Sequence, residues 1–172
     1  MSLSQELDLD LPMQDVHHEA VLSIIHTATQ LTQAGSALLR EWGLTEAQFN
    51  VLFALKYATH PLTQTELARR LVITRASVTS LLDKMEEKKL VERRNVPDNR
   101  RIYHVVQTAK GRALLEEAEP RYRDRIHAVM QAMNLEEHRV LLDNLERVRK
   151  NLSGAHDERA VDRLEESKRA IA

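Results

Sequence analysis

Apolar residues recur every three or four positions along most of this 172-residue chain. That spacing matches the turn of an amphipathic helix. The first run predicts a long helix from about Met13 to Glu41, ended by Gly43, with Trp42 packed near its C-terminus. Its apolar stripe is wide, which predicts burial against more than one neighbouring element. The members of the stripe are Ala20, Val21, Ile24, Ile25, Ala28, Leu31, Leu38 and Leu39.

Capping boxes mark the starts of the next two helices. Thr45–Gln48 begins a helix that runs to about Tyr57, and His60-Pro61 stops it. Thr63–Glu66 begins a shorter helix that ends at Leu71. The candidate core residues of the first of these helices are Phe49, Leu52, Phe53 and Leu55, and those of the second are Leu67, Ala68 and Leu71.

Another helix follows after only two residues, from about Thr74 to Lys88. Its apolar face consists of Val78, Leu81, Leu82 and Met85. The opposite arc carries Ala76, Ser77, Thr79, Ser80 and Lys84. These small or polar residues form a poor surface for a core and a good one for lying in a groove. Two helices joined so closely form a tight helix-turn-helix.

The apolar period then changes from 3.6 to two. Leu90–Arg94 and Ile102–Val106 are predicted to form short strands, and the proline and asparagines of residues 95–101 predict a turn that is followed by paired arginines. Leu62 is predicted to add a strand of one or two residues against this hairpin. A helix-turn-helix followed by a hairpin with a cationic tip is a winged helix, which puts one helix in the major groove and the wing beside it.

Helical spacing returns after the hairpin. Thr108 is predicted to cap a helix that runs to about Met133. Pro120 is expected to kink this helix, because proline deletes a backbone donor and clashes with the preceding turn. Asn134 is predicted to cap a last helix with an apolar stripe, and Ser153-Gly154 is predicted to end it.

The fold class expected from these elements is mainly α with a small β-hairpin wing. Residues 1–12 are expected to be a disordered or loosely docked arm, and residues 13–44 the N-terminal helix of a dimerisation region. Residues 45–108 form the DNA-binding domain. Residues 109–154 supply C-terminal dimerisation helices. Residues 155–172 are a charged tail, either a packed helical arm or a frayed end.

Two short motifs carry a family resemblance. Asp98-Asn99-Arg100 matches an Asp-x-Arg in the wing, and Thr108–Gly111 matches a Thr-x-x-Gly that opens the next helix. With the surrounding sequence, from about Ala20 to Leu152, they resemble the multiple antibiotic resistance regulator (MarR) family of bacterial transcriptional regulators. Lys89 stands where the family usually has glycine, and Gln107 stands where it usually has leucine.

The resemblance implies a ligand-responsive repressor that dimerises through its first, fifth and sixth helices. The apolar stripes at both ends of the chain independently favour a homodimer, because a winged domain of this size cannot bury them all. Two-fold symmetry then predicts a pseudo-palindromic operator with half-sites roughly 34–36 Å apart. The resemblance also implies a pocket for phenolic or other aromatic anions, and the candidate lining residues, chosen by position, are His26, Arg40, Trp42 and Tyr57.

The start of the 74–88 helix carries the main candidate base contacts. Arginine can read guanine through two hydrogen bonds, and hydroxyls or an alanine methyl can read several bases. The alternative is a solvated helix face. Backbone N–H groups of Thr63 and Gln64 are candidate phosphate donors, although ordinary capping explains them equally well. The candidates on the helix are Arg75, Ala76, Ser77, Thr79, Ser80 and Lys84.

The wing supplies the second set of candidate DNA contacts. Arg100 matches the family arginine that enters the minor groove, where a narrow A·T-rich groove attracts a cation. Asp98 is expected to orient it, and Arg101 lies beside it. The alternative for this pair is a surface salt bridge. Arg93 and Arg94 are either phosphate contacts or solvated charges.

The charge distribution favours DNA more than the net charge does. The whole chain carries only −1, but residues 63–110 contain eleven Lys or Arg against six Asp or Glu, a net charge of +5 that leaves −6 elsewhere. A basic module on an acidic body is typical of a DNA-binding protein. The absence of cysteine excludes disulfides, thiol redox sensing and cysteine-ligated zinc.

Other function classes have little support in the sequence. The chain lacks an apolar run long enough for a membrane span and a secretory signal pattern at its start, so we expect a cytoplasmic protein. His17 and His18 are adjacent and do not face one way, so no metal or cofactor is expected. Phosphate-binding loops and hydrolase motifs are missing, which predicts that the chain is not an enzyme. The alternative to a DNA-binding regulator is a winged-helix protein–protein interaction module.

Overall fold

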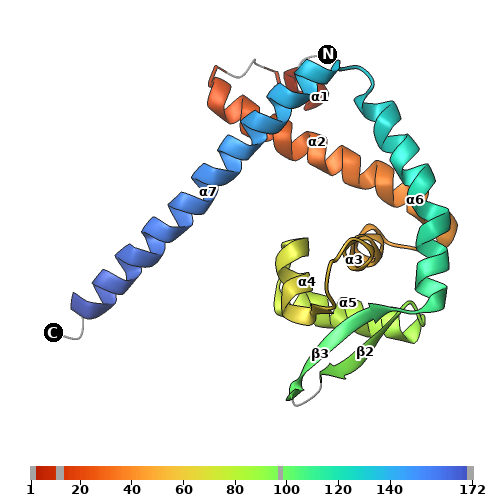
Figure 1. The fold of residues 1–172 in the computed structure, drawn as a ribbon. Helices are drawn as coiled ribbons and strands as arrows, with labels where there is room; N and C mark the ends of the chain where they lie inside the picture. Colours follow the sequence, from red (N-terminus) through yellow and green to blue (C-terminus); the bar gives the residue numbers. More distant parts are fainter. Residues whose placement is uncertain (1–2, 11–13, 97–98, 170–172) are drawn as a thin grey trace. The chain divides into compact units, whose positions relative to one another are not determined.

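The computed structural model describes residues 3–10, 14–96 and 99–169, with side chains described for all of these except 96, 99–101 and 153–169. The fold is mainly helical with one small antiparallel sheet (Figure 1), which confirms the predicted fold class. The chain divides into two compact units, residues 1–125 and residues 126–172. The elements are α1 (Leu3–Glu6), α2 (Val16–Leu39), a 3-10 turn η1 (Arg40–Trp42), α3 (Glu46–Lys56), β1 (Leu62–Thr63), α4 (Gln64–Leu71), α5 (Arg75–Glu87), β2 (Val91–Val96), β3 (Asn99–Gln107), α6 (Ala109–Met130) and α7 (Leu135–Arg169).

The N-terminal arm contains one short helix, α1. Its Glu6 lies 3.4 Å from Nε2 of His26 on α2, and both side chains are partly exposed. Residues 1–2 and 11–13 of the arm lie outside the described residues. The arm therefore includes one helical turn, and its loose docking stays a prediction.

Helix α2 is mostly exposed. Asp15 caps its start at Val16, where the sequence predicted a start at about Met13. As predicted, Gly43, at a φ of 64°, ends the η1 turn that follows. Of the α2 residues only Gly35 and Leu39, near its C-terminal end, are buried. Val21 lies about five turns before Leu39 on the same line of the helix and is 51% exposed. The single chain therefore leaves most of the stripe uncovered, and its burial against more than one neighbour stays a prediction.

The inner faces of α3, α4 and α5 build the core of the first unit, together with the sheet and α6. Phe49 and Leu52 of α3 are buried as predicted, but Leu55 is only partly buried and Phe53 is 41% exposed. Phe53 instead stacks between Phe49 and Tyr57, with ring centroids 6.0 and 4.6 Å away. Residues four apart form one row along a helix, and this row runs from the buried Phe49 to the exposed Tyr57.

Helices α4 and α5 confirm the predicted helix-turn-helix. The Thr63 hydroxyl accepts from the Glu66 N–H (3.2 Å), and the Glu66 carboxylate accepts from the Thr63 N–H (2.8 Å). Thr74 caps α5 by accepting from the Ser77 N–H (3.1 Å). In the turn between the helices, Val72 has a φ of 54° and is 90% exposed. A β-branched residue in this left-handed region is sterically unfavourable.

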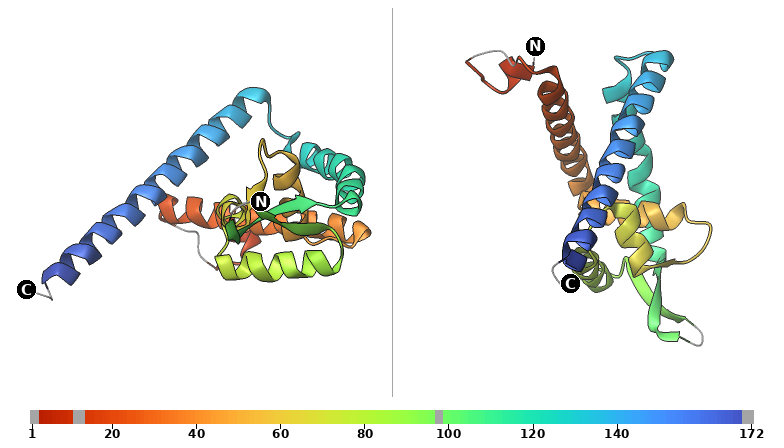
Figure 2. Two further views of the ribbon diagram at one scale, coloured as in Figure 1. Left: turned by 60° about the horizontal axis from the view of Figure 1, so that its bottom comes forward. Right: turned by 90° about the vertical axis from the view of Figure 1, so that its left-hand side faces the viewer.

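The three strands pair antiparallel in the order β1-β3-β2. Leu62 pairs with Val105 and Thr63 with His104, which confirms the short strand predicted at Leu62. Leu62, Val105 and Val91 are buried, so one face of the sheet closes the core. Helix α5 packs against α4 and β2, and Figure 2 shows it beside the β2–β3 hairpin.

The wing strands extend further toward the tip than the sequence predicted. Pairing continues past an irregularity between Asn95 and Val96, so that Val96 pairs with Asn99. Arg100 and Arg101 therefore lie on β3 and not in the turn. The polar residues and the proline concealed this extension, because the strand pattern is interrupted where the register shifts.

Hydrogen bonds tie the end of α5 to the start of α6. The Lys110 ammonium donates to the Lys88 carbonyl (2.9 Å), and the Thr108 hydroxyl donates to the Lys89 carbonyl (2.6 Å). The Thr108 N–H donates to the Leu90 carbonyl (3.1 Å). These three successive carbonyls have no partner within α5, and the hydrogen bonds from Thr108 and Lys110 satisfy them.

This junction also contains four positions that the sequence singled out. The Thr108 hydroxyl accepts from the Gly111 N–H (3.0 Å), which confirms the predicted cap. A Cβ on Gly111 would overlap the Leu90 carbonyl. Lys89 keeps a left-handed φ of 58° although it is not glycine. Gln107 donates from Nε2 to a backbone carbonyl of α3 (2.6 Å), so a hydrogen bond replaces the apolar contact of a leucine.

Replacing Lys89 or Val72 by glycine is expected to raise the free energy of unfolding by about 0.5–1 kcal/mol each. Both residues occupy left-handed conformations that glycine adopts without steric cost. Glu87→Gly, in the last turn of α5, is the control and should lower stability by about 1 kcal/mol. Denaturant unfolding at one protein concentration measures all three. Lower stability for Lys89→Gly and Val72→Gly would contradict the prediction.

Helix α7 continues beyond its predicted end. Asn134 caps it as predicted, because its side-chain oxygen accepts from the N–H groups of Glu136 (2.9 Å) and Glu137 (3.1 Å). The predicted end at Ser153-Gly154 is wrong, since α7 runs on to Arg169. An interior glycine costs only about 1 kcal/mol, and the residues around it favour helix. Helix α6 contains Pro120, and the kink expected there stays a prediction.

Candidate nucleic-acid interface

The outer face of α5 is a rigidly held, exposed polar surface. Val78, Leu82 and Met85 on the inner face have no exposed surface, which fixes the rotation of the helix about its axis. The outer face combines small side chains with two cations. Its exposed residues include all six that the sequence proposed on this helix: Arg75, Ala76, Ser77, Thr79, Ser80 and Lys84.

Polar groups at the start of α5 are partly fixed by their neighbours. Gln64 at the start of α4 donates from Nε2 to the Thr79 hydroxyl, which itself donates to the Arg75 carbonyl (2.9 Å). The Ser77 hydroxyl lies 2.8 Å from that of the capping residue Thr74. Among the described residues, no carboxylate pairs with the Arg75 guanidinium. This end of α5 therefore offers an unpaired cation beside hydroxyls in set positions.

Arg93 holds the wing to α5. Its guanidinium pairs with Asp83 (2.8 Å) and with Glu86, and its backbone N–H donates to Glu86 (2.9 Å). A further hydrogen bond reaches the Thr79 carbonyl (3.5 Å). Sequence reasoning treated Arg93 as a phosphate contact or a solvated charge. The contact between β2 and α5 shows that the Arg93 side chain joins these two elements, and its contact with phosphate stays a prediction.

The remaining wing cations lie further out. Arg94 is exposed and donates from Nε to Glu92 (2.6 Å), a surface pair of small expected energy. The backbone of Arg100 and Arg101 belongs to β3, and their side chains lie outside the described residues. Asp98 also lies outside them. The minor-groove role of the wing tip therefore stays a prediction.

The start of α4 is already occupied by its own cap. The Thr63 N–H donates to the Glu66 carboxylate, and this bond is the main reason why the pKa of Glu66 lies below its usual value. A carboxylate at this position repels a phosphate, so capping is the better explanation of Thr63. Gln64 differs from Thr63, because its side-chain amide reaches α5 and donates to the Thr79 hydroxyl.

A cavity of about 340 Å³ lies between the start of α4, the start of α5 and strand β3. Two of its lining residues, Ile102 and Tyr103, are 40% and 43% exposed and were not among the predicted contacts. Both were placed on a strand, and no feature of the strand pattern separates them from ordinary sheet residues. The lining consists of Thr63, Gln64, Thr65, Arg75, Ile102 and Tyr103.

The four candidate effector residues contact different parts of the chain. His26 lies 2.9 Å from Gln30 on α2. The Trp42 ring faces the Arg121 guanidinium at 5.9 Å, while Arg40 is exposed. Tyr57 donates to Glu119 of α6 (2.5 Å), and this hydrogen bond raises the pKa of Tyr57 above its usual value. Their assignment to one pocket therefore stays a prediction.

Within the described residues, His, Asp and Glu side chains nowhere gather in threes at distances suited to a metal ion. In the same residues, every helix is too short or too polar to cross a membrane.

Comparisons with known proteins agree with this geometry. A model of the MarR family matches residues 42–102. The transcriptional repressor YetL of Bacillus subtilis is 32% identical over 120 residues, which cover 69% of this chain and 72% of that protein. The Mycobacterium tuberculosis regulator MosR, solved in complex with DNA, is 30% identical with a TM-score of 0.64, covering 76% of this chain and 96% of that one. The repressor CouR, bound to a 23-mer DNA duplex, is 26% identical with a TM-score of 0.68, covering 81% and 98%.

The matched sequence includes the helix-turn-helix and most of the wing, whose exposed polar helix and basic hairpin the structure shows side by side. Family, fold and surface agree. The chain belongs to the MarR family of winged-helix, DNA-binding transcriptional regulators.

Proposed function

We propose that this protein is a repressor that binds a pseudo-palindromic operator as a homodimer and releases it when a small molecule binds. The observation that carries the proposal is the exposed face of α5, where small polar side chains lie beside Arg75 and Lys84. YetL and CouR are named as repressors, and MosR and CouR were solved on DNA. A helix of this composition fits a major groove, and the wing fits beside it.

Exposed apolar residues support the homodimer. On α2, Val21, Ile24 and Ile25 are 51%, 40% and 55% exposed, and together they form a row that continues toward the buried Leu39. Helix α7 also exposes apolar residues, among them Leu142 at 63%. Surfaces of this kind normally mark an interaction site, and a second copy of the chain would cover them symmetrically. Two recognition helices would then read half-sites roughly 34–36 Å apart.

The ligand response requires two dimer geometries that differ in the spacing of their recognition helices. An aromatic or phenolic effector releases DNA only if it binds more tightly to the dimer geometry that does not bind DNA. The candidate residues for that effector are still those chosen from the sequence: His26, Arg40, Trp42 and Tyr57. The alternative function is a winged-helix protein–protein module, for which salt-independent, weak contact with DNA is expected.

Arg100→Ala is expected to flatten the salt dependence of DNA binding. Duplexes selected from a random pool provide the operator, and fluorescence anisotropy measures affinity across a salt series. For the native protein, log K should fall linearly as log salt rises. The slope for the variant should be shallower by about 0.9, which is the contribution of one ionic contact. Arg125→Ala, on the exposed part of α6, is the control and should keep the native slope.

Two results would count against this proposal. A native protein whose weak binding does not respond to salt would favour the protein–protein module. A variant slope equal to the native slope would remove Arg100 from the interface.

A further inference from the structure

The Thr79 hydroxyl, on the exposed face of α5, has two hydrogen-bond partners from two helices. It donates to the Arg75 carbonyl one turn earlier (2.9 Å), and it accepts from the side-chain amide of Gln64 at the start of α4. The Thr79 side chain nevertheless belongs to an exposed residue. The hydroxyl is therefore held in place by its own helix and by α4, and it is still open to a partner from outside.

The two partners determine which kind of hydrogen bond the hydroxyl can still form. A hydroxyl has one proton and two acceptor lone pairs. The Arg75 carbonyl can only accept, so it takes the proton, and the Gln64 N–H then occupies one lone pair. One lone pair remains. Thr79 can accept a hydrogen bond from DNA, but it cannot donate one without losing its bond to Arg75.

The neighbouring serines on this face do not have this restriction. Ser77 and Thr74 share a hydrogen bond (2.8 Å) in which either oxygen can be the donor. Among the described residues, the Ser80 hydroxyl has no hydrogen-bond partner. Both serines can therefore turn a proton toward DNA or away from it. Thr79 is the hydroxyl on this face whose donor is already used.

The contact with Gln64 also favours one side-chain conformation of Thr79. A threonine within a helix divides between two χ1 rotamers, which exchange the positions of its hydroxyl and its methyl group. The Gln64 amide donates only to the hydroxyl, so it stabilises the rotamer in which the hydroxyl lies beside α4. Without Gln64, the methyl group would occupy that place for part of the time.

We infer that Thr79 reads an exocyclic amino group in the major groove, that of adenine or cytosine, and that Gln64 positions it to do so. This inference rests on the proposed function. On a given strand, A and C present an amino group in the major groove, whereas G and T present a carbonyl oxygen. A hydroxyl that can only accept favours the amino group and opposes the oxygen. Each half-site of the operator therefore has one position where A or C is preferred to G or T on the strand that Thr79 faces.

The first test compares duplexes selected from a random pool by the full-length native protein and by Thr79→Val. Valine keeps the shape of threonine and removes the hydroxyl. At one position in each half-site, the native protein should prefer A or C to G or T by roughly fivefold. Thr79→Val should lose that preference and keep those at other positions, whereas Thr79→Ser, which retains a hydroxyl, should keep it.

Gln64→Leu tests the positioning role. It should reduce the preference for A or C at the position that depends on Thr79, and leave the other positions unchanged. If Gln64 acts through Thr79, the double variant should lose no more of this preference than Thr79→Val alone. Two losses that add together would mean that Gln64 acts on DNA independently, which would overturn its role as a positioning residue.

A second test removes the amino group from the DNA. In the selected duplex, purine replaces adenine at the position in question, or 2-pyrimidinone replaces cytosine, according to which base was selected. Fluorescence anisotropy should show that the affinity of the native protein falls roughly fivefold. The affinity of Thr79→Val should fall by less than about twofold, because its contact is already absent.

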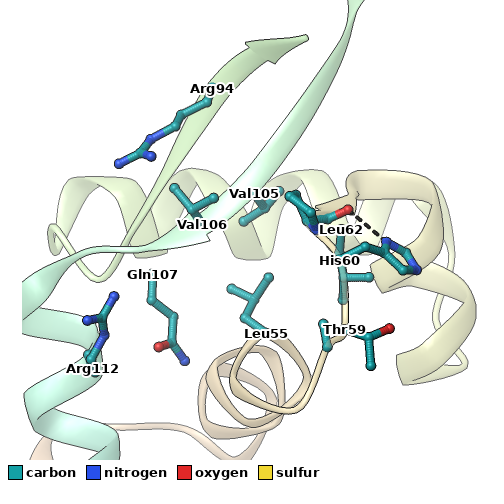
Figure 3. Close-up of a pocket in the computed structure, with 11 residues that line it drawn as sticks. Leu55, Thr59, His60, Leu62, Arg94, Val105, Val106, Gln107 and Arg112 are labelled. Atoms are coloured by element: carbon teal, nitrogen blue, oxygen red, sulfur yellow. Dashed lines mark hydrogen bonds between the residues drawn. The ribbon is translucent and has the colours of Figure 1, made fainter.

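Thr59→Val is the matched control. Thr59 is an exposed threonine in the loop that leads to β1, where it lines a separate cavity of about 410 Å³ beside the sheet (Figure 3). The substitution is the same, but the residue lies outside α4 and α5. Its base preferences and its response to the modified duplexes should therefore match those of the native protein.

The contrary results separate this inference from the proposed function. A preference for G or T at the position that depends on Thr79 would overturn the assignment of the hydroxyl as an acceptor. A defined operator with the same base preferences for the native protein and Thr79→Val would reject Thr79 as a reader and leave the proposed function intact. Selection of no duplex by the native protein would reject the proposed function, and this inference with it.

Discussion

Gly111→Ala is expected to destabilise the winged domain by about 3 kcal/mol or more. A Cβ at this position would overlap the Leu90 carbonyl oxygen and lie 2.9 Å from the Leu90 carbonyl carbon. Neither atom can move easily, because the same carbonyl accepts the Thr108 N–H and lies between α5 and the wing. Denaturant unfolding of native and variant proteins at equal concentration measures the difference.

Gly35→Ala is the matched control, because it is the same substitution in another helix. A Cβ there would meet an edge of the Tyr122 ring at 3.2 Å, and a ring can shift by a few tenths of an ångström. We expect a change within about 1 kcal/mol, since alanine also favours helix over glycine. Equal stabilities for the Gly111 and Gly35 variants would contradict the proposed role of the close approach at Leu90.

Val21→Asp is expected to lower operator affinity by roughly a hundredfold or more, through loss of the dimer. Val21 is 51% exposed on the α2 row that the homodimer would cover. A carboxylate there would be buried without a partner, whereas in the monomer it remains in water. Analytical ultracentrifugation should show a shift to monomer, and anisotropy on the selected duplex should show the weaker binding that a single winged domain retains.

Gln33→Asp provides the control for this variant. Gln33 is exposed on the same helix, twelve residues after Val21 and rotated from it by about a third of a turn around the helix axis. It adds the same charge outside the apolar row, so the dimer and the operator affinity should stay near native. A Val21→Asp protein that remains dimeric would place the interface elsewhere on the chain.

Local signals in the sequence predicted the starts of α3, α4, α6 and α7 correctly. The capping boxes at Thr45 and Thr63 and the caps at Thr108 and Asn134 all form as expected, because each depends on residues within one turn. Helix and strand ends were harder. Gly154 was expected to stop α7, yet one glycine has too small an energetic effect to end a helix whose neighbours favour it.

The candidate DNA-binding residues also divide into those that local sequence signals predicted and those that depend on the packing of distant segments. Periodicity predicted the exposed residues of α5, because their exposure follows from the buried positions of Val78 and Leu82 on the same helix. It did not predict the role of Arg93, which depends on acids contributed by α5 after β2 has packed beside it.

The junction between α5 and α6 has a mechanical consequence. Thr108 and Lys110, at the start of α6, donate hydrogen bonds to three successive carbonyls after α5, those of residues 88–90. These hydrogen bonds couple the end of α5 to the first turn of α6, so we expect a tilt of that turn to be transmitted to α5. The exposed polar face of α5 is then expected to move together with the start of α6.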